Sequence, residues 1–286
     1  MKFQTMSLVA GTPACQAKCP FCVSKMTVPQ DKTLGSTNIN GRNLKKGLLF
    51  AERSGVTTVL ITGKGEPTLY PLDISEYLHY LDNYDIPFVE LQSNMLLCKK
   101  LYENGTLDRW YENGLNTICI SIVHYDNEKN AEIYTPGKEY PDLSETLSML
   151  HEIGYTVRLS CVGVQGYIDD IESFQGLMNF AKENNVAQVS YCPMTNAGNS
   201  KNGKVSEWIE KHALKFYFNI AEHVRVNGTL LMNLVHGAQV FDLDGQNICL
   251  KNCLTRDPEE DTIRQLIFFP DGKLTYDWEY EGARIL

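Results

Sequence analysis

Three cysteines lie within eight residues near the start of the chain, at Cys15, Cys19 and Cys22. They follow a short apolar run, residues 3–9, that is typical of a β-strand. Thiolates so close in sequence can hold one face of a 4Fe-4S cube, and three of them leave one iron without a protein ligand. A catalytic metal centre keeps such an open coordination position, whereas a structural centre closes it. The triplet therefore predicts a fold in which the loop after the first strand faces an active site.

Two other interpretations of the triplet stay open from the residues alone. A structural zinc ion would need a fourth ligand, and no second pair of His or Cys residues stands close by in the sequence. The cysteines can also be unrelated core residues, but Pro13, Lys18 and Pro20 do not suit a regular buried element. The iron–sulfur interpretation is therefore favoured over both.

The composition limits the compartment and the class of partner. Nine cysteines, in a chain whose first residues lack the apolar core of a signal peptide, indicate a reducing compartment and predict a cytoplasmic protein. No stretch reaches the length of a membrane span, so no membrane partner is expected. A formal net charge of -9 without any Lys/Arg stripe makes a nucleic-acid partner unlikely.

Short apolar runs alternate along the chain with amphipathic segments of helical length, which is the pattern of βα units. Each run is nearly all apolar, as a parallel sheet covered on both faces requires. The sequence therefore predicts an α/β fold, a partial (βα)6 TIM-like barrel. The expected strands are 3–9, 57–62, 88–93, 117–123, 156–164 and 188–192, and the expected helices are 40–54, 72–84, 97–113, 143–153, 171–183 and 205–226.

The last part of the chain does not continue this pattern. Residues 1–228 are predicted to form the barrel, and residues 229–286 a short C-terminal extension. The extension contains Cys249 and Cys253 in a polar loop, followed by a β-hairpin whose turn is the Pro-Asp-Gly-Lys sequence at 270–273. Two further βα units, as a closed eight-stranded barrel needs, are not expected there.

An aromatic residue, Phe21, stands directly before the last cysteine of the triplet. The segment thus resembles the signature of the radical S-adenosylmethionine (SAM) superfamily, CxxxCxφC with φ aromatic. The resemblance implies a 4Fe-4S cluster held by Cys15, Cys19 and Cys22, with the amino and carboxylate groups of SAM on the open iron. It places Phe21 near the adenine of SAM, whereas the residue by itself is equally suited to shielding the cluster from water.

A second motif, Gly63-Lys64-Gly65-Glu66-Pro67, follows the second expected strand and resembles the GGEP segment of the same superfamily. Glycine lets the backbone approach a ligand, and a carboxylate offers acceptors to an ammonium group. The resemblance therefore implies that Gly65 and Glu66 bind the amino end of SAM. Lys64 interrupts the usual double glycine. Without the triplet, the segment would be an ordinary turn at the end of a strand.

Softer resemblances add three polar residues and a second metal site. Ser93 and Asn94 end the third expected strand, and Ser121 lies on the fourth, at positions near the methionine and ribose of SAM in the family. Each can also be an ordinary polar group of a strand. Cys249 and Cys253 resemble a shortened form of the extensions that hold a second cluster, although two thiolates are fewer than such a cluster needs. A thiol at the substrate site and two cysteines without function are the alternatives.

Taken together, the resemblance implies an enzyme that reductively cleaves SAM and uses the 5'-deoxyadenosyl radical to abstract hydrogen from a small-molecule or peptide substrate. Such an enzyme needs a reductase such as flavodoxin or ferredoxin as its electron donor. The identity of the substrate does not follow from the sequence. The alternative is an iron–sulfur electron-transfer or metal-binding protein that does not cleave SAM.

Overall fold

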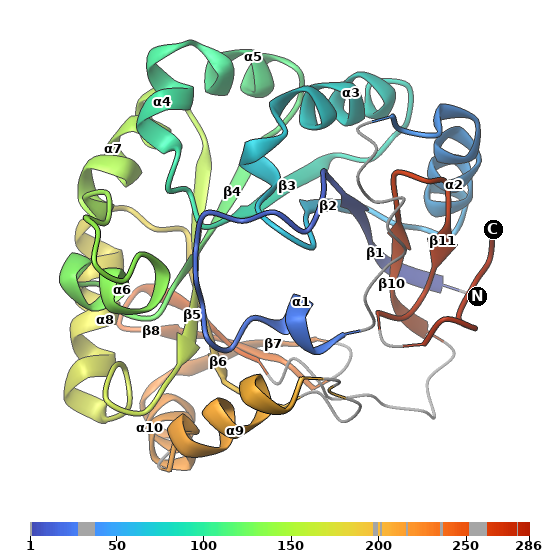
Figure 1. Cartoon of the computed structure of the whole chain (residues 1–286). Helices are drawn as coiled ribbons and strands as arrows, with labels where there is room; N and C mark the ends of the chain where they lie inside the picture. Colours follow the sequence, from blue (N-terminus) through green and yellow to red (C-terminus); the bar gives the residue numbers. More distant parts are fainter. Residues whose placement is uncertain are drawn as a thin grey trace.

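The computed structural model describes residues 2–27, 38–196, 200, 202–215, 217–234, 237–251, 262–278 and 280–286. Six strands follow the predicted pattern closely: β1 (Lys2–Val9), β2 (Thr58–Thr62), β3 (Phe88–Ser93), β4 (Thr117–Ile122), β5 (Thr156–Gly163) and β6 (Gln188–Pro193). The strands after them are β7 (Thr229–Asn233), β8 (Gln239–Leu243), β9 (Gln246–Leu250), β10 (Thr262–Phe268) and β11 (Leu274–Thr275). Figure 1 shows the strands surrounded by helices.

Helices lie in all of the places where they were predicted, but the described helices are more numerous than predicted. The described helices are α1 (Val23–Met26), α2 (Gly41–Arg53), α3 (Pro71–Leu81), α4 (Cys98–Glu103), α5 (Thr106–Glu112), α6 (Asn127–Tyr134), α7 (Leu143–Ile153), α8 (Ile171–Glu183), α9 (Gly203–His212) and α10 (Tyr217–Asn227), with a short 3-10 turn, η2 (Pro67–Leu69). The predicted helix 97–113 is two helices, because Gly105 between them adopts φ +68°. The predicted helix 205–226 is likewise divided into α9 and α10.

The described strands form one sheet in the order β11-β10-β1-β2-β3-β4-β5-β6-β9-β8-β7. From β10 through β1 to β6 and on to β9, every neighbouring pair is parallel. The sheet is not closed, so the predicted α/β fold with an open, partial TIM-like barrel is confirmed. No helix in the described ranges combines the length and the apolar character needed to cross a lipid bilayer.

The C-terminal strands extend the parallel sheet on both sides. β9 pairs with β6 and β10 pairs with β1, both in parallel, while β8, β7 and β11 add antiparallel edges. The predicted hairpin is the pair β10 and β11. The predicted polar loop around Cys249 is wrong, because Cys249 lies inside β9 and is only 1% exposed. Cys253 lies outside the described residues, and the division of the chain at residue 228 stays a prediction.

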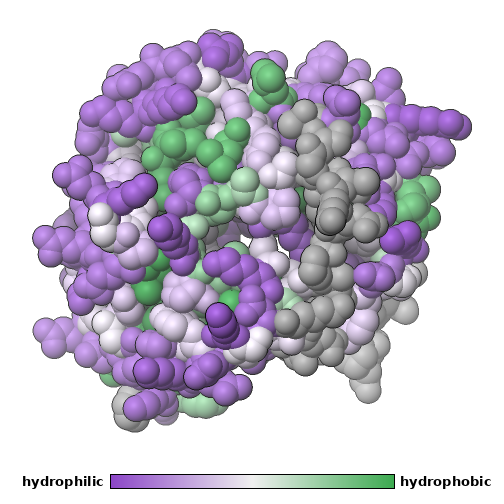
Figure 2. Space-filling view, viewed as in Figure 1, coloured by the Kyte–Doolittle hydropathy of each residue, from purple (hydrophilic) through white to green (hydrophobic). Residues whose placement is uncertain are grey.

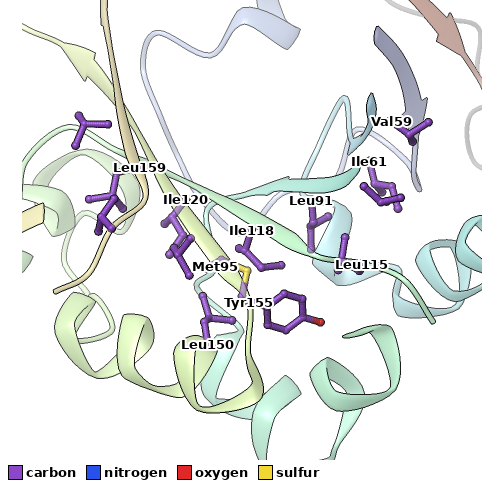
Figure 3. Packing of buried hydrophobic residues seen from close by; sticks show 14 of the residues in the cluster. Val59, Ile61, Leu91, Met95, Leu115, Ile118, Ile120, Leu150, Tyr155 and Leu159 are labelled. Atoms are coloured by element: carbon purple, nitrogen blue, oxygen red, sulfur yellow. The ribbon is translucent and has the colours of Figure 1, made fainter. Parts of the chain in front are cut away.

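The two faces of the sheet differ, contrary to the expectation of strands that are apolar on both. Alternate residues of β2 to β5 pack under the helices; Figure 3 shows Val59, Ile61, Leu91, Ile120 and other apolar side chains gathered in this layer. The residues between them include small or polar ones, such as Glu90, Gln92, Cys119 and Arg158. Because helices cover only one face, the other face is left to form a polar interior.

A buried ion pair crosses this polar interior. Arg158 on β5 donates from Nη1 to Oε2 of Glu90 on β3, and from Nη2 to Oε1 of Gln188 on β6. Gln92 Nε2 donates to the other Glu90 oxygen at 2.9 Å. The Glu90 side chain is 5% exposed, so its charge depends on these donors instead of on water.

We expect the substitution Arg158→Met to lower the free energy of unfolding by about 3 kcal/mol, because it leaves the Glu90 carboxylate buried without its cation. Urea denaturation followed by circular dichroism measures this change. The double variant Arg158→Met/Glu90→Met is the matched control and should recover part of the loss, since it removes both charges. Equal stabilities of the single and double variants would contradict the argument.

Candidate functional site

The predicted site residues meet at the carboxyl ends of the parallel strands. The cysteine loop follows β1, the Gly63–Pro67 segment follows β2, and Ser93 and Asn94 end β3. In Figure 1 the loop between β1 and α1 passes in front of the strand ends. Figure 2 shows that this face is hollowed near its centre, with mostly hydrophilic residues around its periphery. The open side of the partial barrel therefore carries the candidate site.

The Glu66 carboxylate is fixed in position by four donors from its surroundings. Its Oε1 accepts hydrogen bonds from the Thr68 amide at 3.0 Å, the Thr68 hydroxyl at 2.7 Å and the Ser93 hydroxyl at 2.6 Å. Its Oε2 accepts one, from the Asn94 amide at 3.0 Å. Glu66 is only 3% exposed. Oε1 is therefore crowded with donors, whereas Oε2, with a single protein donor, has room for a ligand.

Asn94 links this carboxylate to the cysteine loop. Its side-chain amide donates to the Cys15 sulfur at 3.8 Å, while its backbone amide holds Glu66. Its Oδ1 accepts from Gln16 Nε2 at 3.2 Å and from the Leu96 amide at 3.0 Å. The end of β3 thus joins the acid after β2 to the first cysteine after β1.

The two loops touch through their backbones at Gly65. The Glu66 amide donates to the Ala14 carbonyl at 2.9 Å. A Cβ atom on Gly65 would lie 2.0 Å from the Ala14 oxygen and 2.6 Å from the Thr12 oxygen, which are backbone atoms that cannot rotate away. The small size of Gly65 is therefore required for contact between the loops, whereas its predicted role in SAM binding stays a prediction.

We expect Gly65→Ala to push the cysteine loop away from Glu66 and to lower the free energy of unfolding by about 2 kcal/mol, the usual cost of overpacking. Chemical denaturation is the measurement. Gly203→Ala serves as the control, because a Cβ there would meet no described heavy atom within 4 Å, and its effect should stay within about 0.5 kcal/mol. Equal effects at the two positions would show that the loops are not closely packed.

The three thiols of the triplet lie in one electrostatic environment. Burial, together with the nearby charges of Cys22 and Cys15, raises the pKa of the Cys19 thiol to about 12. Metal binding must therefore displace protons from them. Within the described ranges, no three His, Cys, Asp or Glu side chains converge on a single ion.

Lys64, the residue that interrupts the double glycine, is a buried cation beside the loop. Its Nζ donates to the Thr27 hydroxyl at 2.5 Å and lies 5.3 Å from the centre of the Trp278 ring. Burial lowers the pKa of the Lys64 ammonium to about 8, and the Cys22 thiolate acts in the opposite direction. Trp278 packs edge-on against Phe269 at 5.8 Å. The C-terminal segment therefore reaches the loops of the site through this lysine.

The other predicted residues are placed as follows. Phe21 is half-buried and packs against Trp208 of α9, with ring centroids 5.9 Å apart. Ser121 on β4 is half-buried and lies in register with Ser160 on β5. The hydroxyl of Ser93, predicted as a SAM contact, donates to Glu66 and accepts from the Met95 amide at 2.9 Å. Ser93 therefore positions the acid.

Two residues at the site escaped the sequence analysis. Thr68 donates twice to Glu66, and Gln16, in the cysteine loop, donates to Asn94. Thr68 could have been identified from its distance in sequence to Glu66, because the amide two positions after an acidic residue often donates to its carboxylate. Gln16 carried no such signal, because its neighbours come from strands distant in the sequence.

Comparison with known families agrees with the arrangement. The family model described as the radical SAM superfamily matches residues 9–181, more than half of the 286 residues of the chain. GTP 3',8-cyclase of Staphylococcus carnosus (strain TM300) is 24% identical over 208 residues, which are 70% of this chain and 57% of that protein.

Solved structures share the fold over nearly all of the chain. SuiB of Streptococcus suis, with S-adenosylmethionine bound, superposes with a TM-score of 0.64 and 18% identity over 99% of this chain and 62% of that chain. The enzyme anSMEcpe, with AdoMet bound, gives a TM-score of 0.60 and 13% identity over 99% of this chain and 77% of that chain. The chain spans less than two thirds of the length of the GTP 3',8-cyclase and of SuiB.

Proposed function

The chain is an enzyme that belongs to the radical SAM superfamily, and on that premise we propose that it abstracts a hydrogen atom from a small-molecule or peptide substrate. Membership implies a 4Fe-4S cluster and SAM as cofactors. In our proposal Cys15, Cys19 and Cys22 hold the cluster, and Gly65 and Glu66 bind the amino end of SAM. Phe21, Asn94 and Ser121 are proposed as further contacts.

The observation that carries this proposal is the fixed Glu66 carboxylate beside the cysteine loop. A mere carrier of electrons or metal has no need of a buried acid that is oriented by Thr68, Ser93 and Asn94. Oε2 of Glu66 has one protein donor and room for a second. Asn94 connects it to the cysteine loop, because Asn94 donates to Glu66 Oε2 from its backbone and to Cys15 from its side chain. Three thiols and one acceptor thus fit a cluster with an amino acid on its open iron.

A cluster held by Cys15, Cys19 and Cys22 would, once reduced, supply the electron for reductive cleavage of SAM. The protein contributes position and shielding. Thr68 and Ser93 keep the Glu66 carboxylate from turning, and Gly65 lets the two loops meet. Trp278, over Lys64, covers one side of the loops and helps to exclude water.

The class of substrate rests on weaker support. SuiB of Streptococcus suis has been solved with the precursor peptide SuiA, at a TM-score of 0.58 and 17% identity over 96% of this chain. That complex supports a peptide for this fold, and the net charge of -9 argues against a nucleic acid. We propose a reductase such as flavodoxin or ferredoxin as the electron donor. The high cysteine content, nine in the sequence, favours a reducing compartment, and we propose the cytoplasm.

A second cluster at Cys249 and Cys253 receives little support from the position of Cys249. That thiol lies in β9, where burial raises its pKa. The charges of Lys251, Arg158 and Arg264 act in the opposite direction but do not outweigh burial. The thiol therefore belongs to the polar interior of the sheet around Arg158. We propose a single cluster.

The proposal is tested by anaerobic reconstitution of the protein, reduction with dithionite in the presence of SAM, and quantification of 5'-deoxyadenosine and iron. We expect 5'-deoxyadenosine to form only when reductant is present, with about four iron atoms bound per chain. About eight would indicate a second cluster. A protein that binds iron but forms no 5'-deoxyadenosine with any candidate substrate would favour the electron-transfer alternative and overturn the proposal.

A further inference from the structure

One buried acceptor at the site lacks a partner. Among the described residues, Gln16 Oε1 is the buried side-chain oxygen or nitrogen that makes no hydrogen bond. Gln16 lies directly after Cys15, and its own Nε2 is used, donating to Asn94 at 3.2 Å. Buried polar atoms are nearly always paired, so an acceptor left open next to a cofactor loop points to a ligand or a water that supplies the donor.

The orientation of the Gln16 amide follows from its neighbours. The Leu96 amide donates to Asn94 at 3.0 Å, which identifies the accepting atom as Asn94 Oδ1. Gln16 must then present its Nε2 to that oxygen, because two carbonyl oxygens would repel one another. Oε1 is therefore the atom that faces away from Asn94 and requires a donor.

The neighbours of Gln16 also locate this acceptor. Asn94 contacts Gln16 through Oδ1, Cys15 through Nδ2 and Glu66 through its backbone amide. Asn94 is thus the residue that connects Gln16 to Glu66 Oε2, the other acceptor with room for a donor. An amino group carries at least two N–H donors, whether it is protonated or bound to a metal, so a single acceptor does not satisfy it.

We propose that Gln16 Oε1 accepts a hydrogen bond from the methionyl amino group of SAM, so that Gln16 and Glu66 hold this group together. The inference rests on the proposed function, because it takes SAM as the ligand of the site. It assigns the second residue of the cysteine motif a part in cofactor binding. The position of Gln16 beside Cys15 and Asn94 favours the amino group over the adenine, which Phe21 is proposed to contact.

The test compares SAM with its desamino analogue, in which hydrogen replaces the amino group. Affinities are measured by anaerobic isothermal titration calorimetry on the reconstituted wild type and on Gln16→Leu, which keeps the size of the side chain and removes its acceptor. We expect Gln16→Leu to weaken SAM binding about tenfold. For the desamino analogue, we expect wild type and variant to bind equally, because the partner of Oε1 is missing in both.

Lys18→Ala is the control, since Lys18 is an exposed residue of the same loop, and it should leave the affinity unchanged. Gln16→Asn, which keeps an amide but shortens its reach, is the second variant, with iron content and circular dichroism confirming an intact loop. A Gln16 variant that binds SAM like the wild type, or that loses equal affinity for both ligands, overturns the inference. A wild type that does not bind SAM at all would instead overturn the proposed function.

Discussion

Simultaneous replacement of Cys15, Cys19 and Cys22 by alanine is expected to abolish both iron binding and SAM cleavage. The three thiols lie in one loop over the strand ends, where we propose that the cluster is bound. Without them an iron–sulfur cube has no thiolates to bind it. Iron should fall from about four atoms per chain to near zero, and 5'-deoxyadenosine to the level without enzyme.

Cys249→Ala is the matched control for this prediction. Cys249 is buried in β9 and lies opposite Ser190 of β6, so its loss should leave the iron content and the yield of 5'-deoxyadenosine close to those of the wild type. Iron retained in the triple variant would show that the metal is bound elsewhere. A loss of about half of the iron in Cys249→Ala would instead show that a second cluster exists.

Glu66→Gln is expected to weaken SAM binding about 100-fold, because the amino group loses a charged acceptor. The substitution keeps the size of the side chain but turns an NH2 group toward donors. In the wild type, one carboxylate oxygen of Glu66 accepts hydrogen bonds from Thr68 and Ser93, and the other accepts one from the Asn94 amide. An amide cannot satisfy both sets, so we also expect a lower melting temperature.

Calorimetric titration with SAM and thermal unfolding measure these two effects separately. Glu210→Gln removes the same charge from an exposed position on α9 and should change neither quantity. If Glu66→Gln lowered only the melting temperature and left SAM affinity intact, Glu66 would be a structural residue of the loop. The assignment of the amino end of SAM to this acid would then be wrong.

Much of the fold was predictable because its signals are local. The predicted helices 143–153 and 171–183 coincide with α7 and α8. Both begin after an aspartate whose side chain accepts a bond from the third helical amide, at Asp142 and Asp170. Gly154, with φ +110°, ends the first of them. The residues that form a cap or an apolar pattern lie within a few positions of one another, so the sequence alone can identify them.

The parts that the sequence analysis missed depend on contacts between distant segments. Nothing near Cys249 indicates that residues 246–250 will lie beside β6, and nothing near residue 262 indicates a pairing with β1. The site shows the same limit. Glu66 was assigned from its motif, but the role of Ser93 in holding it and the position of Gln16 depend on three strands meeting.

The pairing of β1 with β10 joins the strand before the cysteine loop to a segment that is translated much later. β2 can join β1 after some sixty residues have been made, but Leu8 meets Phe268 only 260 positions later. Closing so long a loop is entropically costly and slow. A nascent chain on the ribosome therefore carries its three thiols beside an unpaired strand edge. Translation must pass residue 268 before β1 has both of its neighbouring strands.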